Sequence, residues 1–303
     1  MTGPAPVFIS SDQSSDILFT RAPIPHGKVD YLFNRSSDSY INNVDGQDYF
    51  IFHDGEDKLC FVLCDGVGQS YCGQLAAKFL GDYLFNWLED LDANFLQDPS
   101  LIDRLTNDLN VLAEEGQEMV LRHELPENLP DLLLLALTEQ KNYGSEAVFV
   151  AGRVDFQVGK TFPTLNLFWL GDTKIHLFDK HGDEMNIPGS WINSERWSTK
   201  FGIKGAEAVN HWLIELRKIE KMVVHSDGLK GDVLSGLYSL LNIPDEMDSA
   251  VEGLRFSPES DDVSLVSFDL SRAKRRNLRL IFIEIAGYFL YFIHRIKYGI
   301  FRR

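Results

Sequence analysis

Four aspartates occupy positions where predicted strands end or turns begin, and three of the four adjoin an apolar run: Asp48, Asp65, Asp227 and Asp261. Aspartate is depleted in strands, so its repeated appearance at strand edges needs a reason. Carboxylate and carbonyl oxygens are the ligands that Mg²⁺ and Mn²⁺ prefer. A pair of such ions can polarise a phosphoryl oxygen and lower the pKa of a bound water. The set therefore indicates metal-dependent hydrolysis of a phosphate ester, although any one Asp-Gly pair alone is a common turn.

The segment around Asp65 predicts a rigid support for this carboxylate. Two apolar runs, residues 49–52 and 59–63, flank a turn with an Asp-Gly signal at 53–57, which predicts a β-hairpin that ends at Asp65. Apolar residues at helical spacing then predict a helix over residues 72–88. A strand end holds a ligand firmly, and the glycine at 66 allows close approach of a carbonyl or a phosphate.

The rest of the chain alternates between helical and strand-like patterns. Helices are predicted at 99–122, 130–140 and 234–241, and strands at 147–154, 164–170, 174–178, 211–216, 221–225 and 263–268. Residues Gly171, Asp172 and Thr173 are predicted to form a hairpin turn. Strands at both ends of the chain, with helices between them, favour an α+β sandwich.

Charge is distributed unevenly along the chain. The 303 residues carry a net charge of -16, but residues 272–303 contain nine Lys/Arg and one acid, which leaves -24 on residues 1–271. An acidic body argues against nucleic acid as a partner, because phosphate backbones require a basic footprint. The basic end of the chain indicates a separate role.

Cysteine usage and the first residues indicate where the protein works. Cys60, Cys64 and Cys72 are an odd number and lack a second Cys/His pair at zinc spacing, so we predict buried free thiols in a reducing compartment. The N-terminus has neither a basic start nor an apolar core, so no secretory signal is expected. We expect a cytoplasmic protein, with the inner membrane face as a further location.

Seven short motifs occur in one order over residues 40–270. They are 46–49 (GQDY), 63–68 (LCDGVG), 73–77 (GQLAA), 144–147 (GSEA), 171–173 (GDT), 224–229 (VHSDGL) and 261–264 (DDVS). In this order they resemble the type-2C metal-dependent protein serine/threonine phosphatases, in the bacterial form that has Val before the second glycine of the central motif. No single motif is specific, but the ordered series is.

The resemblance implies two packed antiparallel β-sheets flanked by α-helices, two Mg²⁺ or Mn²⁺ ions, and attack on phosphoserine or phosphothreonine in a phosphoprotein by a metal-bound hydroxide. Asp65 would bridge both ions and the carbonyl of Gly66 would bind one. Asp227 and Asp261 would hold the other, and Asp48 would act through a metal-bound water. Asp172 is expected to support the hairpin, although some family members recruit a third ion nearby.

The sequence departs from the family pattern where substrate is handled. The phosphate-binding arginine usually found before the first acidic motif has no match, and Arg35 is the candidate substitute. Asp38 is an alternative to Asp48 as the first acidic motif, but Asp48 is preferred because an apolar run follows it at once. The family's D-H-S motif is absent. His225 is expected to be structural, with a role as general acid as the alternative.

Three regions are predicted: a flexible N-terminal segment at 1–25, a phosphatase-like catalytic domain at 26–271, and a basic amphipathic C-terminal helix at 272–303. The stretch from Leu280 to Ile293 is apolar except for Glu284. This stretch is too short to predict a helix that crosses a membrane. We expect this helix to bind an anionic membrane surface or to dock on protein. A catalytically impaired module that binds its partner through this helix is the alternative function.

Overall fold

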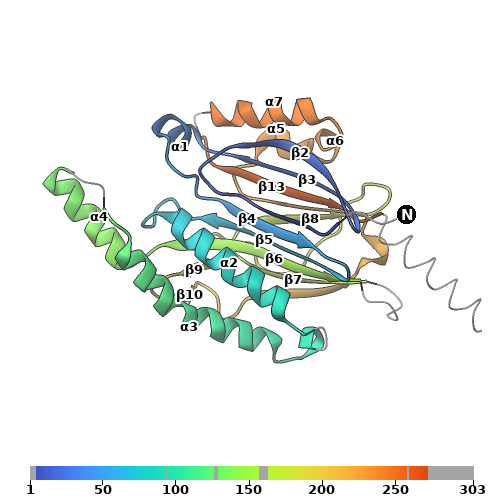
Figure 1. The fold of residues 1–303 in the computed structure, drawn as a ribbon, viewed down its shortest axis with the longest axis horizontal. Coiled ribbons are helices and arrows are strands. Elements are labelled where there is room, and N and C mark those ends of the chain that lie inside the picture. Colours follow the sequence, from blue (N-terminus) through green and yellow to red (C-terminus); the bar gives the residue numbers. More distant parts are fainter. Residues whose placement is uncertain (1–4, 93–94, 126–128, 157–162, 258, 272–303) are drawn as a thin grey trace, which may run out of the picture.

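The computed structural model describes residues 5–92, 95–125, 129–156, 163–257 and 259–271, and in this part of the chain two antiparallel sheets pack face to face (Figure 1). The larger sheet has the order β1-β4-β5-β6-β7-β11, with β9 paired to the start of β6 and β10 paired to β9. Its strands are β1 Val7–Ser10, β4 Tyr49–Asp54, β5 Lys58–Gly66, β6 Glu146–Asp155, β7 Thr164–Leu170, β9 Arg196–Ser198, β10 Gly202–Lys204 and β11 Asn210–Glu215.

The smaller sheet has the order β2-β3-β13-β12-β8. Its strands are β2 Ile17–Ile24, β3 Gly27–Asn34, β8 Lys174–Phe178, β12 Lys221–His225 and β13 Val263–Asp269. Strands β12 and β13 are antiparallel neighbours in the middle of this sheet. The residues that follow β12 and those that precede β13 therefore lie at the same edge of the sheet.

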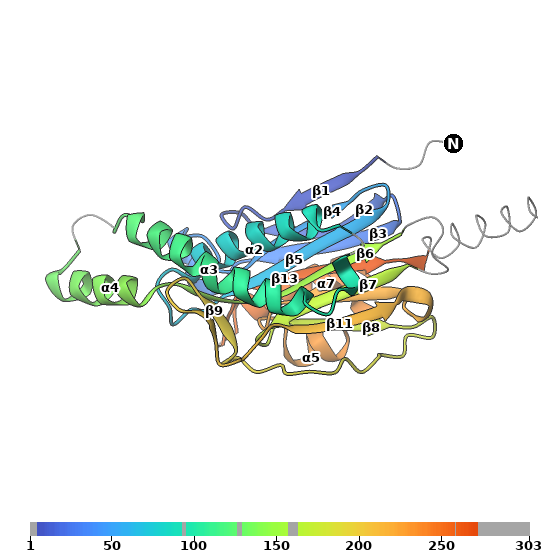
Figure 2. The same ribbon diagram turned by 90° about the horizontal axis from the view of Figure 1, so that it is seen from below.

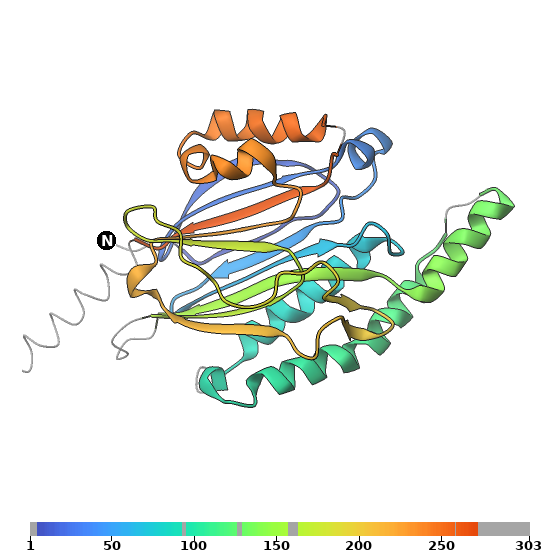
Figure 3. The ribbon, with the colours of Figure 1, turned by 180° about the vertical axis from the view of Figure 1, so that it is seen from behind.

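Helices cover both outer faces of the sandwich. Helices α2 and α3 lie on the outer face of the larger sheet, whereas α5, α6 and α7 lie on that of the smaller one (Figures 1 and 3). The helices are α1 Ser37–Asn42, α2 Gly73–Asp90, α3 Leu101–Arg122, α4 Asp131–Tyr143, α5 Gly231–Ser235, α6 Leu237–Leu240 and α7 Pro244–Arg255, with short 3₁₀ turns at Phe95–Gln97 and Leu216–Lys218.

Continuous apolar strands follow from this layered packing. Along β4, Phe50 and Phe52 point into the core between the sheets, whereas Tyr49 and Ile51 point into the second core beneath α2 and α3. Side chains alternate between the faces of a strand, so a strand buried on both faces is apolar at every position. The core between the sheets is aromatic, with Phe52 and Phe268 in an edge-to-face contact at 5.4 Å.

Residues 5–25 contain strands, whereas the sequence predicted a flexible segment at 1–25. Strand β1 pairs with β4, and strand β2 forms a hairpin with β3 that crosses the expected boundary at residue 25. The side chain of Ile24 is fully buried in the core. Serine, proline and aspartate in this stretch suggested mobility, but the residues between them form two strands, of which β1 pairs with β4 far along the sequence and β2 pairs with the adjacent β3.

The predicted hairpin at residues 171–173 is wrong. Strand β7 belongs to the larger sheet and β8 to the smaller one, so this turn carries the chain from one sheet to the other. Gly171 has φ +98°, and a Cβ atom there would lie 2.2 Å from Cγ1 of Val148. A tight turn that joins two paired strands and a tight turn that joins strands of different sheets have the same sequence pattern, because both require glycine.

Other predicted elements agree with the structure apart from their ends. The hairpin of β4 and β5, helices α2 to α4 and the later strands lie where the sequence placed them. The single helix expected at 234–241 is instead the two short helices α5 and α6. Helix α4 buries none of its residues and extends with the end of α3 beyond the sheets (Figures 1 and 2).

The predicted C-terminal helix at 272–303 lies outside the described residues. None of the helices in the described part of the chain combines the length and apolar character needed to cross a bilayer. The description as α+β with two antiparallel sheets and flanking helices is confirmed.

Candidate metal centre and substrate pocket

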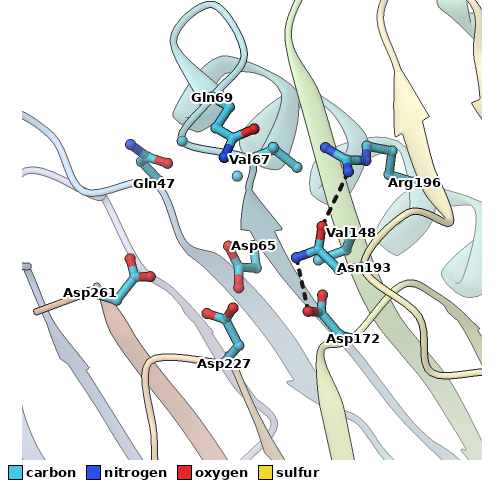
Figure 4. Close-up of a pocket in the computed structure, with 12 residues that line it drawn as sticks. Gln47, Asp65, Val67, Gln69, Val148, Asp172, Asn193, Arg196, Asp227 and Asp261 are labelled. Atoms are coloured by element: carbon cyan, nitrogen blue, oxygen red, sulfur yellow. Dashed lines mark hydrogen bonds between the residues drawn. The ribbon is translucent and has the colours of Figure 1, made fainter. Parts of the chain in front are cut away.

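Three of the four predicted carboxylate ligands, together with Gly66, line one open pocket of about 320 Å³ (Figure 4). Asp65 lies near the end of β5 in the larger sheet, whereas Asp227 follows β12 and Asp261 precedes β13 in the smaller sheet. The carboxylates of Asp65 and Asp227 point toward one another in Figure 4. The pocket therefore forms where the ends of strands from both sheets meet.

Asp48 lies behind this pocket. It precedes β4 by one residue, and the pairing of Tyr49 with Cys64 places Asp48 beside Asp65. Its side chain is 1% exposed, and its Oδ2 atom has no hydrogen-bond partner among the described residues. Burial raises the pKa of Asp48 well above its usual value, and the nearby carboxylate of Asp262 raises it further. An isolated buried carboxylate is costly, so this atom requires a proton or a cation nearby.

The pocket carboxylates repel one another. Burial raises the pKa of Asp65 well above its usual value, and the charges of Asp48, Asp227 and Asp261 add to the effect. Burial and the charges of Asp261 and Asp172 likewise raise the pKa of Asp227. Groups with like charge at close range favour loss of one charge or binding of a counter-ion. The arrangement is electrostatically unfavourable unless a cation neutralises it.

Asp262, the neighbour of Asp261, has a different role. It is buried, and its carboxylate accepts backbone N–H hydrogen bonds from Ser36 at 2.5 Å and from Gln47 at 2.5 Å. These bonds join the start of β13 to the segment that carries Asp48. Asp262 thus positions the chain, whereas Asp261 faces the pocket.

Gly66 allows two chain segments to cross closely. A Cβ atom at this position would lie 2.5 Å from the carbonyl carbon of Gly73 and 2.8 Å from the carbonyl oxygen of Gln47. Any side chain at 66 would push the start of α2 away from β5. The glycine of the central motif therefore has a packing role that is independent of its predicted role as a carbonyl ligand.

Arg35, the predicted substrate-binding residue, is engaged elsewhere. Its Nε atom donates to Oδ1 of Asp16 at 3.0 Å and its Nη1 atom donates to the carbonyl oxygen of Val44 at 3.2 Å. The residue is 8% exposed and is absent from the pocket lining, so the structure does not bring it together with the carboxylates.

Arg196 is the basic residue among the described residues that line the pocket. Its Nη1 atom lies 3.2 Å from Oε2 of Glu146, and its Nη2 atom donates to Oδ1 of Asn193 at 3.2 Å. Asn193 in turn donates to Oδ2 of Asp172 at 3.0 Å. Asp172 therefore lies on the pocket wall, at the turn between the sheets, and not at the tip of a hairpin.

Two other candidates have local partners. Asp38 is exposed in the first turn of α1, away from the pocket lining. His225 is buried; its Nδ1 atom bonds the carbonyl oxygen of Ser226 at 2.7 Å, and its Nε2 atom lies 2.9 Å from Nε2 of His176. Burial lowers the pKa of His225 to about 3, so the ring is neutral at pH 7. These contacts fit the structural role that was expected. Cys60 and Cys64 are buried free thiols and Cys72 is a half-buried one.

Sequence reasoning missed several pocket residues. Gln69 and Val148 lie beside recognised motifs, which was the available signal. Asn193 and Arg196 had no local signal, because the stretch before β9 is irregular and reaches the pocket only through the pairing of β9 with the start of β6.

The carboxylates and the Gly66 carbonyl fit a hard divalent cation in chemistry. The described residues contain no group of three or more Asp, Glu, His or Cys side chains that already surrounds one point as a metal cage would. Mg²⁺ seldom uses such a cage, because it keeps several waters and binds through one or two carboxylates and substrate phosphates. The unpartnered Oδ2 atom of Asp48 and the mutual repulsion of the carboxylates support this kind of site.

No protein-family profile and no curated protein sequence matches the chain. Several solved structures are similar to it in fold. A bacterial serine phosphatase is similar with 13% identity and a TM-score of 0.52, over 81% of this chain and 98% of that one. Serine/threonine phosphatase Stp1 from Staphylococcus aureus is similar with 13% identity and a TM-score of 0.51, over 80% and 94% of the two chains. RsbX, solved in complex with magnesium, has 14% identity and a TM-score of 0.53, over 84% and 100%.

The chain has a serine/threonine phosphatase fold. This likeness confirms the resemblance that the ordered motifs predicted. In this phosphatase fold the motif residues Asp65, Asp227 and Asp261 come together in space although up to 196 positions separate them in sequence. At these low identities the comparison concerns the fold, and the chemistry must be argued from the residues of the pocket.

Proposed function

We propose that the protein is a metal-dependent phosphatase that hydrolyses phosphoserine and phosphothreonine in proteins. One observation supports this most strongly: carboxylates from both sheets converge in one open pocket with raised pKa values and too few cationic partners. Retaining such repulsion reduces stability, so it is explained best by a function that requires bound cations. The similar structures are phosphatases, and one of them was solved with magnesium.

Two Mg²⁺ or Mn²⁺ ions would be held by Asp65, the Gly66 carbonyl, Asp227 and Asp261, with Asp48 behind them. Such ions, when bound, polarise phosphoryl oxygens and lower the pKa of water. The carboxylates would fix the ions, and the open side of the pocket would admit a side chain that projects from a protein surface. Asp172 is the residue placed to assist a third ion, because it lies on the same wall. Function would follow from positioning and electrostatics, without a protein nucleophile.

Hydrolysis of a generic aryl phosphate provides the first test. We expect turnover to require Mn²⁺ or Mg²⁺ and Asp65→Ala to lower kcat/KM by about a thousandfold, or about 4 kcal/mol of transition-state stabilisation. Arg122→Ala, at an exposed ion pair on α3, is the matched control and should retain full activity. Full activity of the wild-type protein in excess chelator would exclude the proposal.

A second candidate function is a catalytically impaired module with the same fold, which binds a protein partner or a membrane surface through residues 272–303. One observation favours it: Arg35, the candidate for the phosphate-binding arginine, is held by Asp16 outside the pocket. Calorimetric titration of the pure protein with Mn²⁺ separates the two functions, because the impaired module would show no binding. Vesicle pelleting of the full chain and of a variant truncated at residue 271 would show whether those residues bind a membrane.

A further inference from the structure

Among the described charged residues that line the pocket, one arginine faces four acids. Among the described lining residues, the acids are Asp65, Asp172, Asp227 and Asp261, and the base is Arg196. Its guanidinium is seen in Figure 4 across the pocket from Asp261. A phosphate monoester carries about two negative charges, so a pocket that binds it benefits from a cation supplied by the protein.

The backbone of Arg196 is held firmly. Strand β9 pairs with the start of β6, so that Trp197 lies opposite Ala147. The Trp197 side chain is fully buried and its Nε1 atom donates to the carbonyl oxygen of Leu109 at 2.8 Å. The residue next to Arg196 is therefore fixed in the core, which holds the backbone of Arg196 at the pocket wall.

The guanidinium belongs to a chain of polar contacts along the pocket rim. Lys204 and Arg196 both bond to Glu146, and Arg196 continues through Asn193 to Asp172. Lys204 and Arg196 lie directly opposite one another on β10 and β9, where two like charges would repel. Glu146 relieves this repulsion, but two cations share this one anion, so Lys204, Arg196 and Glu146 together carry a net charge of +1, and Asp172 meets them only through the neutral Asn193.

Arg196 also has unused donors. A guanidinium carries five N–H groups. Among the described residues, Glu146 and Asn193 each accept from one terminal nitrogen of Arg196, whose side chain is 20% exposed. The remaining N–H groups and the net charge match the needs of a phosphate, which accepts paired hydrogen bonds from a planar guanidinium.

We propose that Arg196 binds the phosphoryl group of the substrate, in the role that the sequence had assigned to Arg35. Arg35 is 8% exposed and its guanidinium contacts Asp16 and a backbone carbonyl away from the pocket, whereas Arg196 lines the pocket and faces its carboxylates. The phosphate-binding cation thus comes from β9 at the wall of the larger sheet. This inference rests on the proposed phosphatase function for its substrate, but the anion site itself is testable alone.

Phosphate binding tests the inference independently of turnover. Inorganic phosphate is titrated calorimetrically into the full chain in buffer with Mn²⁺, for the wild type, Arg196→Met, Arg196→Lys and the control Arg122→Met. We expect Arg196→Met to raise the phosphate Kd by about tenfold or more, since a lost hydrogen bond to a charged group has this scale. Arg196→Lys should retain part of the affinity, and Arg122→Met all of it. The Mn²⁺ affinity of every variant should remain within about twofold of the wild type.

Turnover gives the second readout. With an aryl phosphate, Arg196→Met should raise KM and the inhibition constant of phosphate together, with a smaller change in kcat. Equal phosphate affinity of Arg196→Met and the wild type would overturn the inference. If the wild type binds phosphate through Arg196 but does not hydrolyse the ester, the proposed function fails while the anion site stands.

Glu146→Gln distinguishes a direct contact from a structural role of the rim. This variant keeps the guanidinium and removes its ion-pair partner, so phosphate affinity should stay equal or increase. A loss as large as that of Arg196→Met would show that the rim acts through its shape, which would contradict direct binding. Thermal unfolding of each variant confirms that the protein is folded.

Discussion

Two clusters of charged residues lie in the same sandwich but differ in how their charges are balanced. In the arginine cluster, defined as Asp16, Arg35, Arg255 and Glu252, two cations face two anions. Arg255 donates to Oδ2 of Asp16 at 2.6 Å and lies 3.3 Å from Glu252, and Arg35 donates to Asp16 at 3.0 Å. The pocket carboxylates Asp48, Asp65, Asp227 and Asp261 have no comparable set of cations.

The pKa values differ in the same way. Burial alone would raise the pKa of Asp16, but hydrogen bonds from Arg255 and Arg35 outweigh it and lower the value. In the pocket, burial and like charges act together and raise the pKa of Asp65 and Asp227. A cluster balanced within the chain stabilises the fold. A cluster left unbalanced indicates a partner from outside, here a divalent cation.

Asp16→Asn should have the larger effect on stability. It leaves two arginines without their shared carboxylate, and the Arg255 side chain is 5% exposed, so we expect a loss of about 3 kcal/mol at pH 7. Because the folded pKa of Asp16 lies below its unfolded value, its contribution is present at neutral pH and is lost as pH falls through the folded pKa. Thermal unfolding should therefore show a difference from wild type that narrows below about pH 4. A difference independent of pH would contradict the charge-based account.

Asp227→Asn should have a smaller effect on stability, and of opposite sign, when no metal is added. The pKa of Asp227 is raised by burial and by Asp261 and Asp172, so its charge disfavours folding at pH 7. The Asp227 carboxylate is crowded by its neighbours but borders the open pocket, where solvent screens its charge, so removal of that charge should stabilise the metal-free protein by no more than about 1 kcal/mol. Differential scanning calorimetry in the presence of chelator measures the change in stability. Asp261→Asn, at the neighbouring pocket carboxylate, is the variant for comparison. A clear loss of stability would mean that the carboxylates do not repel one another.

The sequence predicted the pocket carboxylates because each lies beside an apolar strand with a glycine or serine nearby, which is a local signal. The same local signals could not distinguish the turn at 171–173 from a hairpin, because only long-range pairing decides which sheet a strand joins. Arg35 and Arg196 illustrate the limit: Asp16, 19 residues away, binds the Arg35 guanidinium, whereas the pairing of β9 with β6 brings Arg196 to the pocket. The residues that flank each arginine in the sequence do not indicate either contact.

Strand β1 was missed for a related reason. Strand β1 is four residues long and is fixed by pairing with β4, which lies more than 40 residues further along the chain. Asp261 and Asp262 were recognised as one motif, but their side chains have separate functions because neighbouring residues of an extended chain point in opposite directions. Motifs thus located the site, whereas the roles of individual residues depended on packing.

Calorimetric titration with Mn²⁺ tests the central claim most directly. The wild-type protein should bind the ion and gain thermal stability in proportion to its concentration. Asp65→Asn should lose both responses, whereas Asp16→Asn, although less stable, should retain them because the arginine cluster is balanced without metal. Absence of Mn²⁺ binding by the folded wild-type protein, or equal binding by Asp65→Asn, would contradict the account.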